Sequence, residues 1–217
     1  MANGIKNIKR ILILSPHTDD AELGCGGSII NFIEQKKQIL WVVFSTADES
    51  LPENMQKNTL KDEFMEVAKK LSLKDNQVII NNFKVRYLHE RRQDVLELLI
   101  KIRHDFKPDL VIGPSLNDFH QDHVVVANEM VRAFKSTSSI ISYELPWNHV
   151  NFNTQFFSRL TINHIEKKID LLTSYKSQLQ KDRLYFSGKF IEGLARTRGI
   201  QVNTEFAEAF EVIRWIE

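Results

Sequence analysis

Two short segments of the chain gather residue types that bind metal ions or move protons. The first segment covers residues 16–24 and places one imidazole and three carboxylates within six positions, namely His17, Asp19, Asp20 and Glu22. Neighbouring like charges repel, so a divalent cation is the simplest partner that would make this cluster favourable. Adjacent side chains usually point in different directions, and one aspartate could bind a metal while the other acts on water. The aspartate pair could also be an ordinary helix cap beside a solvated neighbour.

The second segment covers residues 117–123 and contains His120, Asp122 and His123. If this segment opens a helix, its two histidines, three positions apart, lie on one face. Two histidines and one carboxylate, with water in the fourth position, would make a catalytic zinc site. His17, Asp20 and His123 could supply those ligands if the two segments meet. A His-x-x-His pair alone could instead be a helix cap beside an exposed imidazole.

Short apolar runs that alternate with amphipathic stretches indicate the elements that would bring the two segments together. The runs cover residues 11–14, 39–45, 77–81, 109–113 and 140–143, and helical spacing covers 55–71 and 95–106. This alternation predicts the α/β class: a Rossmann-like, mostly parallel sheet flanked by helices, formed by about residues 1–145. In such sheets ligands bind beyond the carboxyl ends of the strands, so the segments that follow the first and fourth runs are expected to share one edge.

The alternation loosens after residue 145, which predicts a C-terminal α/β appendage over about residues 146–217. It would comprise a loop with Phe152, Phe156 and Phe157 in its core, helices at 163–181 and 191–198, and a closing strand at 206–215. We expect this appendage to shape the substrate pocket. The total length of 217 residues favours a single domain.

Composition excludes several classes of protein. With 29 basic and 28 acidic residues, the formal net charge of +1 offers no long-range field to hold nucleic acid or an anionic membrane. The single cysteine, Cys25, excludes an intrachain disulfide framework, and no apolar run approaches the ~20 residues needed to span a bilayer. We therefore expect a cytoplasmic protein, with a homo-oligomer possible. The glycines around Cys25 fail the spacing of a dinucleotide-binding loop, so Cys25 is expected to be a buried apolar residue.

On these residues the chain resembles the LmbE-like, or PIG-L, family of zinc-dependent N-acetylglucosaminyl de-N-acetylases. The family's first motif, Pro/Ala-His-Pro-Asp-Asp followed by an acidic residue and glycines, is matched at residues 16–27. Its second motif, His-Pro-Asp-His, is matched at residues 120–123. Thr18 and Gln121 stand where the family usually has proline, and Lys61 stands where many members carry a substrate-binding arginine. These departures concern loop rigidity and substrate identity rather than the metal ligands.

The resemblance implies a metal-dependent hydrolase that removes an N-acyl group, expected to be N-acetyl, from an amino sugar or a sugar conjugate. Zn²⁺, or another divalent metal, would be held by His17, Asp20 and His123. The alternatives are a non-catalytic sugar or nucleotide-sugar binding domain and an amidase that acts on a thiol conjugate.

The same resemblance distributes the remaining roles. Asp19 would act as the base, and His120 as the oxyanion stabiliser and acid. Asp122 joins this catalytic group because its charge would favour the protonated form of His120. Lys61 and Arg86 are the expected substrate contacts, although Arg86 could equally form a solvated salt bridge.

Overall fold

The computed structural model describes residues 7–52 and 55–217. The sequence also predicts a long loop at 48–58, and part of it lies outside the described residues. These residues form a seven-stranded sheet in the order β3-β2-β1-β4-β5-β7-β6. The pairs among β1 to β5 are parallel, and β7 runs antiparallel to both β5 and β6. The strands are β1 (Arg10–His17), β2 (Gln38–Ser45), β3 (Val78–Ile80), β4 (Leu110–Gly113), β5 (Ser139–Tyr143), β6 (Phe156–Leu160) and β7 (Phe206–Arg214).

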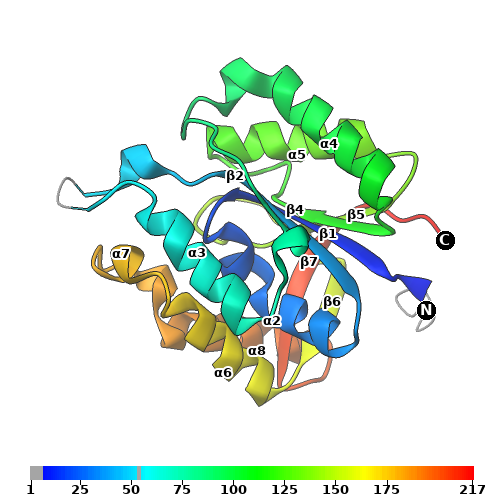
Figure 1. Cartoon of the computed structure of the whole chain (residues 1–217). Coiled ribbons are helices and arrows are strands. Elements are labelled where there is room, and N and C mark those ends of the chain that lie inside the picture. The colour runs from blue at the N-terminus through cyan, green and yellow to red at the C-terminus, as the bar shows by residue number, and fades with distance from the viewer. Residues whose placement is uncertain (1–6, 53–54) are drawn as a thin grey trace.

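Helices cover both faces of the sheet (Figure 1). One face carries α4 (Arg92–Phe106) and α5 (Gln121–Phe134), and the other carries α2 (Asp20–Glu34), α3 (Thr59–Lys70), α6 (Ile162–Leu172) and α8 (Gly188–Ile200), with α7 (Lys176–Leu179) beside α3. Along β1, Ile11 and Ile13 pack with the second group of helices, whereas Leu12 and Leu14 pack with α4 and α5. Strands buried on both sides have no polar face, which explains their continuous apolar sequences. The predicted α/β class is confirmed.

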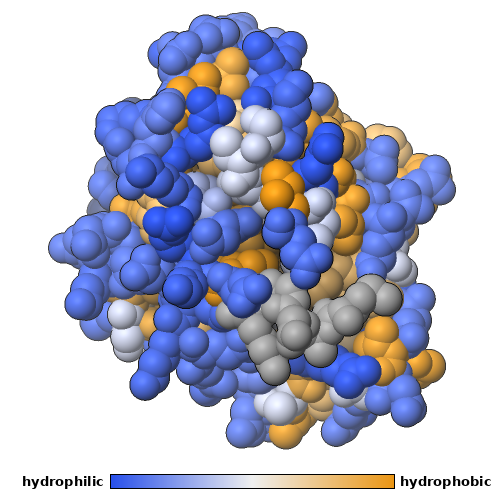
Figure 2. Space-filling model, turned by 90° about the vertical axis from the view of Figure 1, so that its right-hand side faces the viewer, coloured by the Kyte–Doolittle hydropathy of each residue, from blue (hydrophilic) through white to orange (hydrophobic). Residues whose placement is uncertain are grey.

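The face of the molecule shown in Figure 2 is covered mostly by hydrophilic side chains, with apolar ones scattered among them. Among the described residues, no helix has the length and apolar character needed to cross a membrane.

The strand order creates a switch point between β1 and β4. From β1 the chain crosses through α2 to β2 on one side, whereas β4 pairs with β1 on the other side. The loops that leave β1 and β4 at their carboxyl ends therefore diverge and leave a crevice between them. These loops lead into α2 and α5 and carry the two polar segments of the sequence.

Three predicted boundaries were wrong. The loop expected after residue 145 contains β6, which pairs with β7 from the far end of the sequence. The helix expected at 163–181 is two helices, α6 and α7, because the chain turns at residues 173–175 to bury Tyr175 completely. Helix α3 begins four positions later than expected, because Asn58 adopts a left-handed backbone conformation with φ of 69°.

The glycine-rich start of α2 packs tightly against neighbouring elements. A Cβ atom on Gly24 would lie 2.4 Å from the Tyr143 ring, so only glycine fits there. Cys25 is fully buried and has non-helical backbone angles where α2 kinks. The buried ion pair of Lys168 and Glu208, 2.7 Å apart, bonds backbone groups on both sides of this kink. The prediction that Cys25 is a buried apolar residue is confirmed.

Candidate active site

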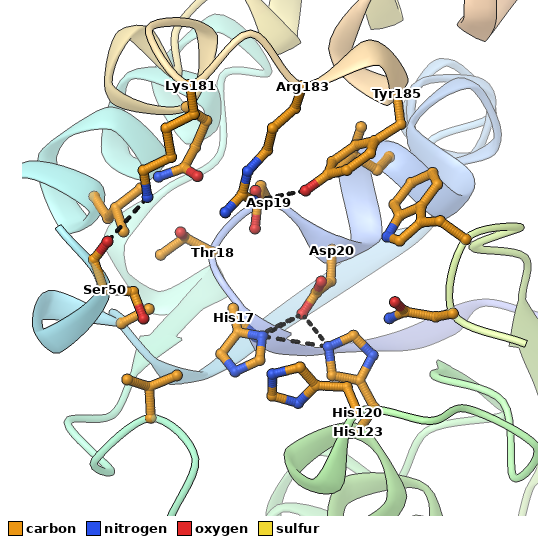
Figure 3. A pocket seen from close by; sticks show the side chains of 17 residues that line it. His17, Thr18, Asp19, Asp20, Ser50, His120, His123, Lys181, Arg183 and Tyr185 are labelled. Carbon is orange, nitrogen blue, oxygen red and sulfur yellow. Dashed lines mark hydrogen bonds and ion pairs between the residues drawn. The ribbon is translucent and has the colours of Figure 1, made fainter. Parts of the chain in front are cut away.

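Three side chains from three elements meet at the switch point. His17 ends β1, Asp20 opens α2, and His123 lies in the first turn of α5. The distance from Asp20 Oδ2 is 3.2 Å to His17 Nδ1 and 3.2 Å to His123 Nε2, and the two ring nitrogens are 3.3 Å apart (Figure 3). Ligands at the usual bond lengths around a tetrahedral zinc ion are roughly 3.3–3.4 Å apart. The triangle therefore has the size of one face of a tetrahedral metal site.

A second set of ligands overlaps the first. Ring nitrogens of His17, His120 and His123 all lie within 4.8 Å of one another, which also suits a metal ion. The triangle that includes Asp20 is more compact and supplies a negative charge to the cation. We therefore favour His17, Asp20 and His123 as the ligand set. Either set of three residues could hold a metal ion.

Two further carboxylates orient the two imidazoles. Asp118 Oδ2 is 2.8 Å from His123 Nδ1, and Asp122 Oδ2 is 3.0 Å from His17 Nε2. A carboxylate in this position keeps the proton on the ring nitrogen that it contacts and leaves the lone pair of the other nitrogen free for a metal. Asp122 is fully buried and does not line the cavity. Its position behind His17 is that of an orienting group.

The electrostatics of the triangle favour positive charge. Burial alone would lower the pKa of His17, but the Asp20 carboxylate and the Asp122 hydrogen bond raise it to about 9. Burial would also lower the pKa of His123, but the Asp20 and Asp118 carboxylates outweigh it and raise this pKa to about 10. The two imidazoles in turn hold the pKa of Asp20 far below its usual value despite burial. The same negative field that retains protons here would attract a cation in their place.

The triangle forms part of the wall of a cavity of about 250 Å³. Asp19 is half-buried beside it and precedes the first residue of α2 without capping the helix. Burial and the adjacent Asp20 carboxylate raise the pKa of Asp19 to about 6. Asp19 is therefore ionised at neutral pH and faces the same space as the triangle. The full lining is His17, Thr18, Asp19, Asp20, Leu23, Ala47, Ser50, Leu60, Val85, His120, His123, Trp147, Asn148, Gln178, Lys181, Arg183 and Tyr185.

His120 lines the cavity as a neutral imidazole. It caps α5, and its Nδ1 accepts the backbone N–H of Asp122 at 3.2 Å, so that nitrogen carries no proton. Burial and the neighbouring His17 and His123 lower the pKa of His120 to about 4. The charges of Asp20 and Asp122 favour the protonated form, as the sequence analysis expects of Asp122, but burial and the two histidines outweigh them. The proton of His120 lies on Nε2.

Glu22, the third carboxylate of the first segment, does not line the cavity. The Tyr175 hydroxyl lies 2.5 Å from Glu22 Oε1 and 2.5 Å from the Thr18 carbonyl oxygen. Burial raises the pKa of Glu22 well above its usual value and so favours its uncharged form. The Tyr175 hydroxyl carries one proton and donates it to one of these two oxygens at a time. An uncharged Glu22 lowers the repulsion within the crowded segment, and Tyr175 fixes the backbone next to Asp19.

The two predicted substrate contacts do not line the cavity. Lys61 and Arg86 are exposed, and only their neighbours Leu60 and Val85 reach the cavity wall. The backbone N–H of Arg86 donates to Asp122, while its side chain contacts the Glu49 carbonyl. A substrate contact by either residue stays a prediction.

Two cations that the sequence analysis missed do line the cavity, namely Lys181 and Arg183. They follow α7; Arg183 contacts the Tyr185 hydroxyl, and Trp147 from the same C-terminal region stacks on Tyr185. The expectation that residues after 145 shape the pocket is confirmed. The spacing of these residues in the sequence carries no signal that would have placed them near His17.

Comparisons with known proteins agree with this geometry. The family model described as PIG-L, GlcNAc-PI de-N-acetylase, matches residues 12–134, which is more than half of the chain. The "uncharacterized deacetylase YaiS" of Escherichia coli K12 is 27% identical over 174 residues, which cover 78% of this chain and 91% of that protein.

Solved structures share the fold at lower identity. N,N′-diacetylchitobiose deacetylase from Pyrococcus horikoshii, solved with an inhibitor, matches with a TM-score of 0.77 and 21% identity over 97% of this chain and 86% of that one. GalB, the 4-carboxy-2-hydroxymuconate hydratase from Pseudomonas putida KT2440, matches with a TM-score of 0.75 and 20% identity over 97% and 99%. From its two motifs, its sheet and the match over residues 12–134, we conclude that the chain belongs to the PIG-L family of de-N-acetylases.

Proposed function

We propose that the protein is a zinc-dependent hydrolase that removes the N-acetyl group from an amino sugar or a small sugar conjugate. The observation that carries this proposal is the triangle of His17, Asp20 and His123, which has a carboxylate behind each imidazole and an open side toward the cavity. Closed structural zinc sites have four protein ligands, whereas hydrolytic sites keep one position free. Asp19, ionised and facing the same cavity, supports catalysis over binding alone.

The proposal assigns a role to each side chain around the reacting amide. His17, Asp20 and His123 would hold the ion, which when bound polarises the acyl oxygen and makes the attacking water more acidic. Asp19 takes a proton from that water and passes it to the departing amine, so that no net proton is consumed at the carboxylate.

His120 stabilises the acyl oxygen as it gains negative charge. Because Nδ1 accepts a backbone N–H, the proton on Nε2 is available to the cavity. A fixed donor at this place stabilises the charge that develops in the transition state. In this proposal His120 donates a hydrogen bond as a neutral group. This differs from the role of acid that the resemblance implies for it. Asp122 orients His17 and contacts no reacting atom.

The size of the cavity limits the substrate. Its volume of about 250 Å³ is below the roughly 300–1,000 Å³ typical of sites for drug-sized ligands. It suits one sugar ring with its N-acyl group, and any conjugate would extend toward solvent. The Pyrococcus relative is named for a diacetylated disaccharide, which agrees with an amino-sugar substrate.

The test measures acetate release together with metal content. We expect the purified protein to contain zinc and to release acetate from N-acetylglucosamine or its conjugates. Chelation should abolish the activity and zinc should restore it. The Asp20→Ala variant should lose the metal, whereas the matched control Asp62→Ala, an exposed aspartate on α3, should keep both metal and activity. Undiminished acetate release by metal-free protein would refute the proposal.

The same assay separates the alternatives. A thiol-conjugate amidase would release its acyl group only from a thiol-bearing substrate. A non-catalytic binding domain would hold the sugar without releasing acetate. GalB shares this fold and is named as a hydratase, so similarity of fold alone does not decide the reaction.

A further inference from the structure

Two cations project into the cavity without an acidic partner. Lys181 Nζ donates to the Ser50 carbonyl oxygen at 2.9 Å, and Arg183 Nη1 donates to the Tyr185 hydroxyl at 2.6 Å. Both side chains are half-buried. Among residues 7–52 and 55–217, no carboxylate lies within 4.0 Å of either cationic group. Cations that have lost part of their hydration and have no acidic partner favour an added anion.

The charge balance of the cavity agrees with this. Its lining contains two carboxylates, Asp19 and Asp20, and two cations, Lys181 and Arg183. Asp20 belongs to the triangle, so Asp19 is the one lining carboxylate that remains for the two cations. Burial, followed by the repulsion from Arg183, lowers the pKa of Lys181 and outweighs the attraction of the Asp19 and Glu63 carboxylates.

The two cations lie opposite the metal ligands. In Figure 3, Lys181 and Arg183 enter from one side of the cavity, the three histidines from the other side, and Asp19 lies between them. Tyr185, which accepts the hydrogen bond from Arg183, stacks on Trp147 with ring centroids 4.1 Å apart and an angle of 12° between the ring planes. This stack fixes the position of the guanidinium before a ligand arrives.

We propose that Lys181 and Arg183 form a subsite for an anionic group, a phosphate or a carboxylate, on the amino sugar whose amide reacts at the metal site. The inference rests on the proposed function and narrows its substrate class. A planar guanidinium pairs with two oxygens of either anion, and a lysine ammonium adds a third contact. The opposite placement of histidines and cations means that the anionic group and the N-acyl group occupy different positions on the sugar.

The test compares neutral and anionic sugars as substrates. The probes are N-acetylglucosamine, its 1-phosphate, its 6-phosphate and its uronic acid, so the last three distinguish phosphate from carboxylate and one ring position from another. We expect kcat/KM for at least one anionic probe to exceed that for N-acetylglucosamine by roughly 10-fold or more. In Lys181→Met and in Arg183→Met, the ratio of kcat/KM for the anionic probe to kcat/KM for N-acetylglucosamine should fall by roughly 10-fold. Lys176→Met, an exposed lysine on α7, is the matched control and should keep the ratio.

Binding to metal-free protein gives a readout that does not depend on activity. Quenching of tryptophan fluorescence would report occupancy beside Trp147, with Kd expected to be lower for the preferred anionic probe than for N-acetylglucosamine. If no probe releases acetate, the proposed function fails, and this binding comparison alone decides the inference. Equal kcat/KM for all probes in the unaltered protein would overturn the inference. Equal losses for neutral and anionic probes in Arg183→Met would also overturn it, because they would place Arg183 at the reacting carbonyl.

Discussion

The role of Asp122 offers a sharp test of how the site is organised. Asp122 Oδ2 contacts His17 Nε2 at 3.0 Å and accepts the Arg86 N–H at 2.6 Å, while Oδ1 accepts the Leu88 N–H at 3.2 Å. Asp122→Asn keeps the shape but replaces one acceptor oxygen with an NH2 donor. In one orientation the NH2 group opposes the Leu88 N–H, which costs about 1–3 kcal/mol. In the other it opposes His17 and drives the ring proton to Nδ1, where the metal must bind.

Both orientations weaken the metal site without touching the substrate. Loss of a carboxylate that orients a metal-binding histidine typically lowers metal affinity by roughly 10–100-fold, or about 1.4–2.8 kcal/mol. We expect Asp122→Asn to show this increase in the Kd for zinc, measured by competition with a chromogenic chelator. Saturating zinc should then largely restore kcat.

The matched control is Glu129→Gln on the same helix. Glu129 is fully buried and pairs with Arg92 and Arg132, away from the cavity lining. The Glu129→Gln variant should have a lower free energy of unfolding and an unchanged Kd for zinc. If Asp122→Asn binds zinc normally but loses kcat by 100-fold or more, on the order of the loss expected for a catalytic acid or base, Asp122 acts on the substrate and our assignment is wrong.

Four further outcomes are expected. Asp19→Asn should retain zinc while kcat falls by roughly 10²–10⁴-fold, and an unchanged kcat would remove Asp19 as the base. His120→Ala should lower kcat by roughly 10²–10³-fold at full zinc content, measured by mass spectrometry, whereas loss of zinc would favour the ligand set that includes His120. The pKa values of about 9 and 10 for His17 and His123 mean that metal-free protein holds protons there at pH 7. Zinc must displace them, so its affinity should rise with pH and calorimetry in different buffers should show at least one proton released; a flat profile from pH 6 to 8 would contradict this. Gly24→Ala should lower the free energy of unfolding by about 1–3 kcal/mol in denaturant titrations, because its Cβ would overlap the Tyr143 ring; an unchanged midpoint would show that the ring moves freely.

The sequence was sufficient to predict the parts of the molecule that are set by local pattern and sheet geometry. Runs of apolar residues identified β1, β2, β4 and β5, because strands covered on both faces must be apolar throughout. The convergence of His17, Asp20 and His123 followed from their positions after β1 and β4, whose carboxyl ends meet at the switch point. No detail of packing was needed for that step.

The parts that were missed depend on packing between distant segments. β6 is an edge strand that forms only by pairing with β7, so its own sequence carries a weak signal. The sequence also did not reveal that Lys61 and Arg86 lie outside the cavity lining, which their neighbours Leu60 and Val85 join. Arg86 has a left-handed backbone with φ of 71°, which a pattern of residue types does not reveal.

Chemistry was easier to predict than substrate because the two depend on different parts of the chain. The proposed metal ligands and Asp19 lie at the carboxyl end of β1 and in the first turns of α2 and α5, or just before them, and the parallel strands fix where these elements meet. Lys181, Arg183 and Tyr185 lie on the turn and short 3-10 helix after α7, which reach the cavity because the C-terminal helices pack over the α2 side of the sheet. Substitutions in this turn can therefore change which sugar is accepted while the triangle stays intact.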